Sequence, residues 1–375
     1  MRQNYKRLGN YIQPLKVRNK DMKAKGLLGI NINKHFMSSV ANIVGTDLSN
    51  YKLVQKDQFA CNRMHVGRDY RIPIAVSKSD EPFIVSPAYD VFEIKKPNEL
   101  LPEYLMMWFE RTEFDRNAWF YTDADVRGGL AWQAFEDMQL PIPHPDKQRE
   151  IVKEYNTIQN RITQNQQLIQ KLEETAQAIY KRWFVEGVDL ENLPEGWRFG
   201  KLSDIATIIM GQSPVGESYN EVGVGVALIN GPVEFGEYFT VKTKWTTEPK
   251  KYCEKGDLIF CVRGSTVGKN VVADDRYAIG RGVCAIRSKY QNYLIQLVKY
   301  NLNEILKDVT GSTFPNIDRV TLGDYPIAIS ANTLLEEFEK KVSPISNIVW
   351  VKSLENQKLT ELKALLLSRL ATVED

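Results

Sequence analysis

The sequence of 375 residues has little cysteine and histidine, the residues that most often build structural metal sites. Its four cysteines, Cys61, Cys253, Cys261 and Cys284, form no Cys-x-x-Cys pair, and its three histidines are widely separated. These spacings argue against a zinc site and favour free thiols in a reducing compartment. The sequence also lacks an apolar run near the ~20 residues of a membrane span, and no apolar stretch follows its basic N-terminus. We therefore expect an uncleaved, cytoplasmic protein that binds no metal.

The sequence also lacks the motifs of nucleotide-binding and DNA-modifying enzymes. It contains no Gly-x-x-x-x-Gly-Lys-Ser/Thr loop and no Asp...Glu-x-Lys nuclease set. Residues 86–89 (SPAY) are distantly similar to the Asn/Asp-Pro-Pro-aromatic tetrad of adenine-N6 methyltransferases. However, Ala88 replaces the second proline, and Ser86 lacks the carbonyl that would accept the amino protons of the base. Residues 223–225 (GVG) do not close the strand-to-helix turn of a cofactor loop. We expect no catalytic residue, with an adenine-N6 DNA methyltransferase as the less favoured alternative.

The composition is that of a globular protein, with 43% hydrophobic residues, 26% charged residues and a net charge of +2. This net charge is too small to indicate nucleic-acid binding by itself, so such a function must depend on where the basic residues cluster. The length favours two domains over one.

An internal repeat at about half the length of the chain organises the sequence. The two copies share a layout more than residue identities, as expected of one frame with two specificities. The paired segments are residues 8–12 and 202–206, 56–63 and 256–263, 66–68 and 267–269, 89–92 and 283–286, 127–129 and 311–313, and 140–143 and 325–327. Because a long helical pattern follows each copy, we predict four segments with the boundaries 1–146, 147–187, 188–332 and 333–375.

Each predicted helix has about 37 residues, and at ~1.5 Å per residue it would be roughly 55 Å long. The first extends from about Lys147 to Phe184, and its apolar positions alternate spacings of four and three, which is typical of a coiled-coil seam. These positions are Ile151, Tyr155, Ile158, Ile162, Asn165, Ile169, Leu172, Ala176, Ile179 and Trp183. The second extends from about Thr333 to Leu370. Its seam is Phe338, Val342, Ile345, Val349, Leu359, Leu366 and Leu370, interrupted by Lys352, Asn356 and Lys363.

We predict that the two helices pair antiparallel, although each could instead pack only on its own domain. If their midpoints near residues 167 and 354 are opposed, Asn165 falls opposite Asn356. A buried amide pair costs stability but disfavours shifted registers, in which each amide would face an apolar residue. Alternatively, Asn165 is a tolerated polar residue in an otherwise apolar seam.

The globular segments have the patterns of mixed α/β domains. Strands are predicted at residues 83–85, 257–262 and 270–273, and helices at residues 103–111 and 291–306. The predicted fold class is α+β, with two mixed α/β domains separated by two long helices that form an antiparallel coiled coil.

Basic loops in both copies are candidates for contact with nucleic acid. Residues 263–270 (RGSTVGKN) join two predicted strands, with glycines that permit close backbone approach and basic residues that supply charge and donors. The first copy has residues 63–71 at the matching place and a basic run at 16–25, which takes the place of 210–214. The candidate contacts are Lys16, Arg18, Lys20, Arg63, Arg68, Arg71, Gln212, Ser213, Lys244, Lys250, Lys251, Arg263, Ser265 and Lys269. Such groups can also be merely solvated, and Trp245 within the patch at 242–252 could belong to a core.

Several of these segments together resemble a known family. Residues 193–197 (LPEGW), 255–260 (KGDLIF), 263–265 (RGS) and 267–269 (VGK), with Pro326-Ile327 before the terminal helix, are similar to specificity subunits of type I restriction-modification enzymes. The resemblance covers nearly the whole chain. It implies two target-recognition domains, each reading one half of a bipartite asymmetric DNA site, and two helical spacers that set the spacing and bind two modification subunits. A rigid rod between two readers would fix the distance between half-sites.

The resemblance also implies that this chain binds no cofactor, with S-adenosylmethionine, ATP and magnesium on partner subunits, and it allows a restriction subunit as a further partner. The first copy departs from the pattern, with Lys56 in place of Gly256 and residues 62–65 (NRMH) in place of 262–265 (VRGS). The pairing of individual contacts there stays open. The alternative function is a protein-binding coiled-coil adaptor without DNA specificity, which would explain the helices but not the basic loops.

Overall fold

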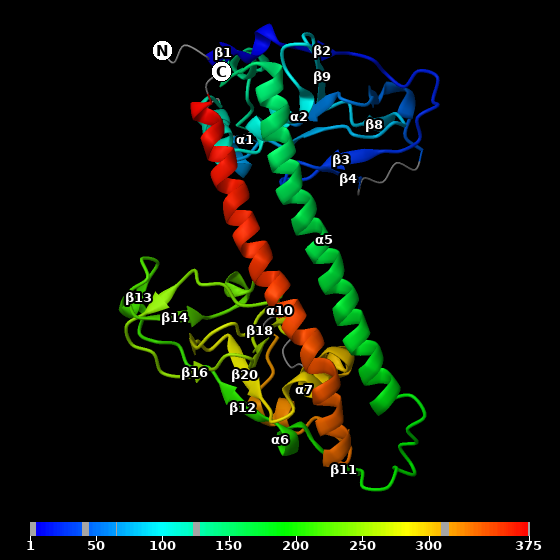
Figure 1. Ribbon diagram of the computed structural model, residues 1–375, viewed down its shortest axis with the longest axis vertical. Coiled ribbons are helices and arrows are strands. Elements are labelled where there is room, and N and C mark those ends of the chain that lie inside the picture. The colour runs from blue at the N-terminus through cyan, green and yellow to red at the C-terminus, as the bar shows by residue number, and fades with distance from the viewer. Residues whose placement is uncertain (1–4, 40–44, 65, 123–127, 309–314, 374–375) are drawn as a thin grey trace. The chain divides into compact units, whose positions relative to one another are not determined.

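The computed structural model describes residues 5–39, 45–64, 66–122, 128–308 and 315–373. It divides into two compact units, one formed by Met1–Ile162 with Gln357–Asp375 and the other by Thr163–Asn356. We call them unit 1 and unit 2. Each contains a globular part and sections of the two long helices α5 and α10 (Figure 1). None of the helices among the described residues is long and apolar enough to cross a membrane.

The first globular part consists of short strands and helices that precede α5. Its elements are β1 (Tyr5–Arg7), η1 (Leu8–Asn10), β2 (Ile12–Leu15), β3 (Leu28–Ile30), β4 (Phe36–Ser38), η2 (Leu48–Asn50), β5 (Lys52–Val54), β6 (Phe59–Cys61), α1 (Val66–Asp69), β7 (Ile74–Val76), β8 (Phe83–Val85), β9 (Asp90–Ile94), α2 (Pro102–Phe109), α3 (Thr112–Phe120), α4 (Trp132–Asp137) and β10 (Gln139–Pro141), where η denotes a 3₁₀ helix. The helix α5 then spans Pro145–Phe184.

The second globular part lies between α5 and α10. Its elements are β11 (Arg198–Lys201), α6 (Leu202–Ile205), β12 (Thr207–Met210), η3 (Gly216–Ser218), β13 (Tyr219–Asn220), β14 (Val226–Ile229), η4 (Pro232–Glu234), β15 (Trp245–Thr246), β16 (Tyr252–Cys253), β17 (Leu258–Cys261), β18 (Asn270–Val272), β19 (Tyr277–Ile279), β20 (Val283–Arg287), α7 (Gln291–Tyr300), α8 (Leu302–Ile305), η5 (Leu306–Asp308), α9 (Arg319–Gly323) and β21 (Pro326–Ile329). The helix α10 (Asn332–Arg369) and η6 (Leu370–Thr372) follow.

The two globular parts share one sheet frame, which confirms the repeat. A four-stranded antiparallel sheet has the order β2-β9-β6-β7 in unit 1 and β12-β20-β17-β18 in unit 2. In each part a separate two-stranded pair, β1-β10 or β11-β21, joins the first strand to the strand that precedes the long helix. A backbone hydrogen bond directly after the first strand also recurs. The N–H of Leu8 donates to the carbonyl of Met138, and the N–H of Leu202 donates to the carbonyl of Tyr325.

The strand register corrects one of the predicted pairings by a single residue. Phe59 pairs with Phe92 in unit 1, and Leu258 pairs with Ile286 in unit 2, so Phe59 and Leu258 are equivalent. Asp57 therefore takes the place of Gly256, and both have positive φ, 63° and 91°. Because side chains alternate across a strand, this slip reverses every face. Consequently, residue 63 corresponds to residue 262 and not to Arg263.

A second predicted pairing also differs in the structure. Residues 66–68 lie in the helical turn α1, whereas residues 267–269 form the end of the turn before β18. The predicted equivalence of residues 127–129 and 311–313 cannot be placed, because residues 127 and 311–313 lie outside the described part of the chain. By contrast, residues 89–92 and 283–286 correspond as predicted, on β9 and β20.

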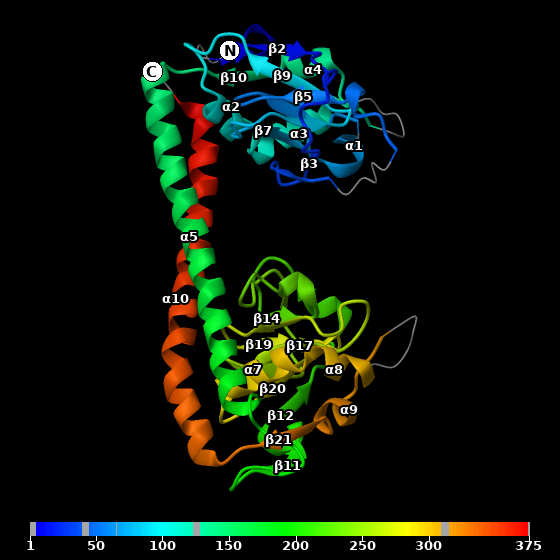
Figure 2. The same ribbon diagram turned by 90° about the vertical axis from the view of Figure 1, so that its right-hand side faces the viewer.

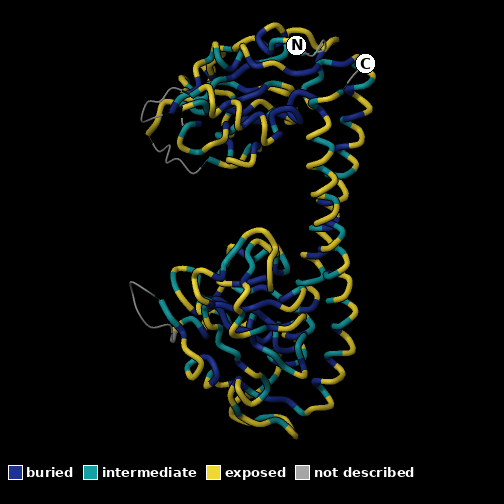
Figure 3. Tube along the Cα trace, turned by 90° about the vertical axis from the view of Figure 1, so that its left-hand side faces the viewer, coloured by how far each residue is buried: buried dark blue, intermediate teal, exposed yellow. Residues whose placement is uncertain are grey.

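Aromatic clusters fill the core of each unit. In unit 1, the Phe59 and Phe92 rings stack with centroids 5.0 Å apart, and Phe109 meets Phe59 edge to face at 5.9 Å. In unit 2, the core extends onto both long helices, where Phe184 of α5 and Phe338 of α10 have centroids 5.2 Å apart. Buried residues follow the strands and one side of each helix (Figure 3). Since such pairs contribute about 0.5–1.5 kcal/mol beyond area burial, they fix the helix ends to the sheet.

The helices α5 and α10 match their predicted limits to within about two residues and run antiparallel (Figures 1 and 2). In unit 2, the Nδ2 of Asn165 donates a 2.9 Å hydrogen bond to the Oδ1 of Asn356. Both residues are buried, with 2% and 9% of their surface exposed. The antiparallel amide pair is therefore confirmed, and Asn165 is not merely a tolerated polar residue.

The seam positions are buried or half-buried along both helices. Ile151, Tyr155, Ile162, Ile169 and Ala176 are buried on α5. The lysine at position 363, which interrupts the apolar pattern of α10, has polar partners in unit 1. Its Nζ donates to the Oε1 of Gln159 at 2.7 Å and lies 3.6 Å from the Oε2 of Glu110. This interruption is therefore a specific polar contact.

All four cysteines are buried and free. Burial raises the pKa of the Cys261 thiol to about 11 and that of Cys253 to about 12, which disfavours the reactive thiolate at neutral pH. Among the described residues, no group of three or more His, Cys, Asp or Glu side chains is placed to hold a metal ion.

Candidate nucleic-acid interface

The loop between β17 and β18 in unit 2 is held by backbone hydrogen bonds, both within the loop and to Pro315. The N–H of Gly264 donates to Pro315 at 2.9 Å, and that of Lys269 donates to Thr266 at 3.0 Å. Gly268 has φ of 93°, and a Cβ at this position would lie 2.9 Å from the Cδ1 of Leu306, so a glycine is required there. The loop therefore presents Arg263, Ser265 and Lys269, all of which are exposed, on a defined backbone.

Two arginines converge on a cavity beside this loop. Arg263 and Arg281 line a space of about 660 Å³ together with Asn230 and Asn316, and none of the lining residues is acidic. Gly280 and Gly282 flank Arg281, and a Cβ on either would lie about 2 Å from an atom of Asn230. Because two guanidinium groups without a carboxylate favour an anion, this cavity is suited to a phosphate or to acceptor groups on a base edge. We call it the Arg263 cavity.

The predicted residues Gln212 and Ser213 lie at the same edge of the four-stranded sheet. They follow β12, while the loop with Arg263 follows β17 and Arg281 precedes β20; these strands are adjacent and antiparallel. The Oγ of Ser213 accepts a 3.3 Å hydrogen bond from the backbone N–H of Arg281. Sequence reasoning missed Arg281, although its flanking glycines between two strands were a usable signal.

The other predicted contacts of unit 2 lie elsewhere. Lys244, Lys250 and Lys251 do not line the Arg263 cavity. Lys244 is half-buried, and its carbonyl accepts a hydrogen bond from Leu228 within the sheet. Trp245 lies on β15 and packs against the core, as its alternative interpretation stated.

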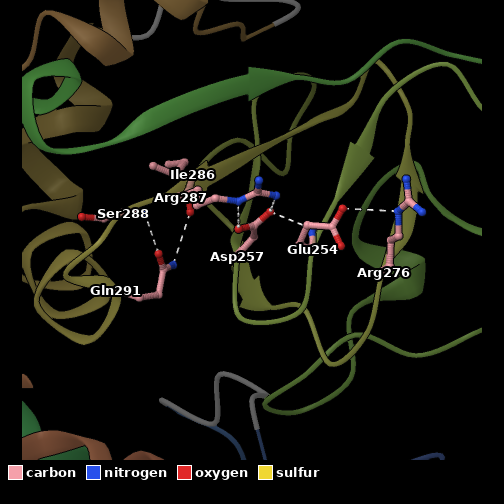
Figure 4. Close-up of polar contacts among 7 residues, drawn as sticks. All are labelled: Glu254, Asp257, Arg276, Ile286, Arg287, Ser288 and Gln291. Atoms are coloured by element: carbon pink, nitrogen blue, oxygen red, sulfur yellow. Dashed lines mark hydrogen bonds and ion pairs between the residues drawn. The ribbon is translucent and has the colours of Figure 1, made fainter.

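An ion pair between the buried Asp257 and the partly exposed Arg287 joins β17 and β20 at the opposite end of β17 (Figure 4). Asp257 accepts two 2.7 Å bonds from the Nε and Nη2 of Arg287 and a 2.8 Å bond from the N–H of Glu254. In unit 1 the equivalent residues are Gln58 and Glu93, and the neutral amide of Gln58 donates from its Nε2 to Glu93 at 3.1 Å. These contacts fix the strands that end at the Arg263 cavity, and they provide an indirect role for the predicted Gly256-Asp257 motif.

In unit 1, Arg63 is committed to internal contacts. Its Nε donates to the Oδ2 of Asp90 at 2.8 Å, its Nη1 donates to the carbonyl of Leu130, and its guanidinium lies 5.3 Å from the ring centre of Trp132. Arg68 is exposed and forms two bonds with Asp69, at 2.7 and 2.9 Å. The one-residue correction and these contacts together explain why Arg63 does not project like Arg263.

The basic run of unit 1 lies where the sequence predicted. Pro14 pairs with Phe92 as Ile208 pairs with Ile286, so Lys16 and Met210 occupy equivalent positions. Lys16, Arg18 and Lys20 are exposed, and Arg18 donates to the Oδ1 of Asn50 at 2.9 Å. This loop is therefore at the same sheet edge in unit 1 as residues 210–214 are in unit 2.

Comparisons with known proteins agree with this architecture. Residues 194–364 match the family model of the type I restriction modification DNA specificity domain. The chain is 23% identical over 363 residues to a Methanocaldococcus jannaschii protein assigned as the MjaX type I restriction enzyme specificity subunit, covering 92% of this chain and 83% of that protein. It is also 22% identical over 430 residues to the HindI specificity subunit of Haemophilus influenzae, covering 91% and 92%. The chain is therefore similar to specificity subunits of type I restriction-modification systems over nearly its whole length.

A solved structure supports the fold of this chain. The S subunit of a type I restriction-modification system from M. genitalium superimposes with a TM-score of 0.61 and 14% identity, over 99% of this chain and 96% of that chain. The predicted fold class, two mixed α/β domains with two long antiparallel helices, is therefore confirmed. These matches support recognition of a DNA sequence, and they favour neither the methyltransferase nor the adaptor alternative.

The chain also exposes apolar side chains on α10. In unit 2 these are Ile348, Val351 and Leu354, and in unit 1 they are Leu362 and Leu365. The unit 1 pair lines a groove of about 480 Å³ with Ile158 of α5. Apolar groups that gather on the outside of a polar helix mark a surface for another protein.

Proposed function

We propose that this chain is a specificity subunit that reads a bipartite, asymmetric DNA site, one half with each globular part, and that it carries no catalytic centre of its own. Two copies of one frame with different side chains at the same sheet edge support this division. The boundaries that we propose for the recognition domains are residues 1–146 and 188–332, with the spacers at 147–187 and 333–375.

The Arg263 cavity carries the proposal for the second half-site. Its two arginines reach it from adjacent strands, and its backbone is constrained by glycines at both loops. In this proposal Arg263 or Arg281 donates to a guanine edge or a phosphate, and Ser265, Lys269, Gln212 and Ser213 contact the surrounding backbone. Lys244, Lys250 and Lys251 would contact only flanking DNA, because they lie outside the cavity.

For the first half-site we propose contacts from the loop after β2. Lys16, Arg18 and Lys20 lie at the positions equivalent to residues 210–214, and all three are exposed. Arg68 and Arg71 add positive charge from the segment at α1. Arg63 supports this surface from inside through Asp90 and Leu130.

We further propose that α5 and α10 set the number of base pairs between half-sites and bind two modification subunits. The buried Asn165–Asn356 pair supports a single register. The exposed apolar residues of α10 support binding of a protein partner. S-adenosylmethionine, ATP and magnesium would then belong to the modification and restriction subunits and not to this chain.

The decisive experiment is methylation sequencing of DNA from cells that express this chain with its modification subunit. We expect modified adenines at one bipartite motif with a constant gap. Exchange of residues 1–146 for the equivalent segment of a relative should change one half-site and leave the other half-site and the gap unchanged. A change in both half-sites would contradict modular reading.

A further inference from the structure

A second cavity in unit 1 combines positive charge with exposed aromatic rings. It measures about 770 Å³, and its lining includes Tyr70, Arg71, Lys78, Arg116, Trp119 and Tyr155. Tyr70 follows α1 directly and Trp119 lies near the end of α3, two helices that lie close together (Figure 2). We call this space the Trp119 cavity.

The charge of the Trp119 cavity is not balanced by its own acids. Among the described residues, Arg71, Lys78 and Arg116 have no carboxylate partner. The two acids that line the cavity, Asp115 and Glu110, are engaged by other lining residues. Asp115 accepts from the Nζ of the buried Lys34 at 2.7 Å and from the N–H of Ile72 at 3.1 Å. Glu110 accepts from the hydroxyl of Tyr155. The cavity therefore offers three available cations to an anionic group.

The aromatic wall of the cavity is unusually exposed. Trp119 and Tyr70 are 43% and 62% exposed, and their ring centres are 5.3 Å apart. Phe120 and Tyr121, which follow in sequence, are 74% and 54% exposed. Since α3 buries Phe114 and Ala118 on its other side, the helix needs no outward aromatic residues for its own packing. Exposed rings gathered at one place mark a binding surface.

We infer that the Trp119 cavity binds one nucleotide of the DNA, away from the sheet edge that carries Lys16, Arg18 and Lys20. Arg71 and Arg116 hold the phosphate of this nucleotide, and its base stacks on Trp119. Aromatic rings stack on bases regardless of sequence, and apolar wedges enter steps that are kinked. The cavity would thus anchor the DNA at an opened step beside the first half-site. This inference rests on the proposed function, because it assumes that unit 1 faces DNA.

Asymmetry between the units favours DNA over a modification subunit as the occupant. In unit 2 the segment that follows α7, Leu302–Ile305 and Leu306–Asp308, carries no aromatic residue, and its Lys307 is paired with Glu304 at 2.6 Å. Two copies of the same partner would require similar surfaces on both units. A row of exposed aromatic residues that, among the described residues, follows the helix α2 in unit 1 but not the equivalent α7 in unit 2 suits a DNA contact that differs between half-sites.

The test uses the full chain with its modification subunit and a duplex that contains the sequenced site. Trp119→Ala removes the stacking ring, Trp119→Phe retains a ring, and Arg116→Gln removes one cation. Phe199→Ala and Arg182→Gln are matched controls, because both residues are exposed and lie in unit 2. Binding is measured over a range of salt concentrations, and dAMP is titrated as a free-nucleotide probe.

We expect Trp119→Ala to weaken duplex binding about 5- to 150-fold with an unchanged salt slope, and Trp119→Phe to restore most of the affinity. Arg116→Gln should lower the slope of log affinity against log salt by about 0.9. The controls should match the wild type. Unchanged binding by both cavity variants would refute the inference, as would tight dAMP binding that duplex DNA does not displace. Failure of modification-subunit assembly with intact DNA binding would also refute it, by assigning the surface to protein. A wild-type complex without a bipartite motif would instead refute the proposed function.

Discussion

The buried amide pair between α5 and α10 allows a quantitative test of how the spacer keeps its register. Replacing Asn165 alone by Leu leaves the amide of Asn356 buried without its 2.9 Å partner, and the reverse change does the same to Asn165. An unsatisfied buried polar group costs about 1–3 kcal/mol, which offsets the stabilisation by the added apolar side chain. The double variant has no orphaned amide and retains that stabilisation at both positions.

The expected signature is therefore a coupling energy. The double variant should be more stable than the sum of the two single variants predicts, by about 1–3 kcal/mol. Urea unfolding of the four proteins, followed by circular dichroism, measures this difference. The pair Asn160→Ala and Asn347→Ala is a control, since both residues are exposed and belong to different compact units, and its effects should be additive. Coupling indistinguishable from zero at Asn165 and Asn356 would refute the argument.

The same double variant has a functional readout. Two leucines pack almost equally well in shifted registers, whereas an amide opposite an apolar residue does not. We expect methylation sequencing to show more than one gap length for Asn165→Leu with Asn356→Leu, and a single gap for the wild type. A constant gap in the more stable double variant would mean that other contacts determine the register.

The candidate interface and the long helices support three further predictions. Replacing Arg263 and Lys269 by Ala should weaken DNA binding and lower the slope of log affinity against log salt by about 0.9 for each phosphate that is no longer neutralised. If Arg263 reads a base, its loss should instead relax one position of the second half-site at a cost of roughly 1–3 kcal/mol. A folded double variant with unchanged affinity, slope and specificity would exclude a DNA contact by this loop. Deleting seven residues from each helix should shorten the gap in methylation sequencing, and an unchanged gap would exclude the spacer role. Burial raises the pKa of Glu339, so protonation of this carboxyl favours the folded state, and this stabilisation should be lost as pH rises above the usual pKa of 4.5. The melting temperature of Glu339→Gln should not fall over that pH range as that of the wild type does. Parallel curves of melting temperature against pH for the two proteins would contradict this prediction.

Glu339 is of structural interest because it connects the spacer to the second globular part. Its carboxylate, on α10, accepts from the N–H of Tyr293 at 2.9 Å and from the Nδ2 of Asn292 at 2.7 Å, at the start of α7. In unit 1, Gln148 of α5 has a similar role, since its Oε1 accepts from the N–H of Leu101 before α2. Each long helix thus caps the start of a helix in a globular part, α7 in unit 2 and α2 in unit 1.

Local patterns in the sequence were sufficient for the helices, the frame and the family. The spacing of apolar residues located α5 and α10 because helical periodicity depends only on neighbours along the chain. The same spacing, with the two midpoints opposed, was enough to place Asn165 against Asn356. Recurrence of short strand motifs predicted the repeated sheet, since each copy must bury the same faces.

Tertiary contacts decided which side chains are available to a ligand. The one-residue slip between residues 56–63 and 256–263 became visible only in the strand pairings, and it moved Arg63 from the surface to an internal bond with Asp90. Arg281 joined Arg263 because β20 begins where β17 ends. The available charge of Arg71 and Arg116 likewise depends on Lys34, which engages Asp115 from a distant loop. Sequence spacing determines which face of an element a residue occupies, but its partners come from other elements, and only the folded chain brings those together.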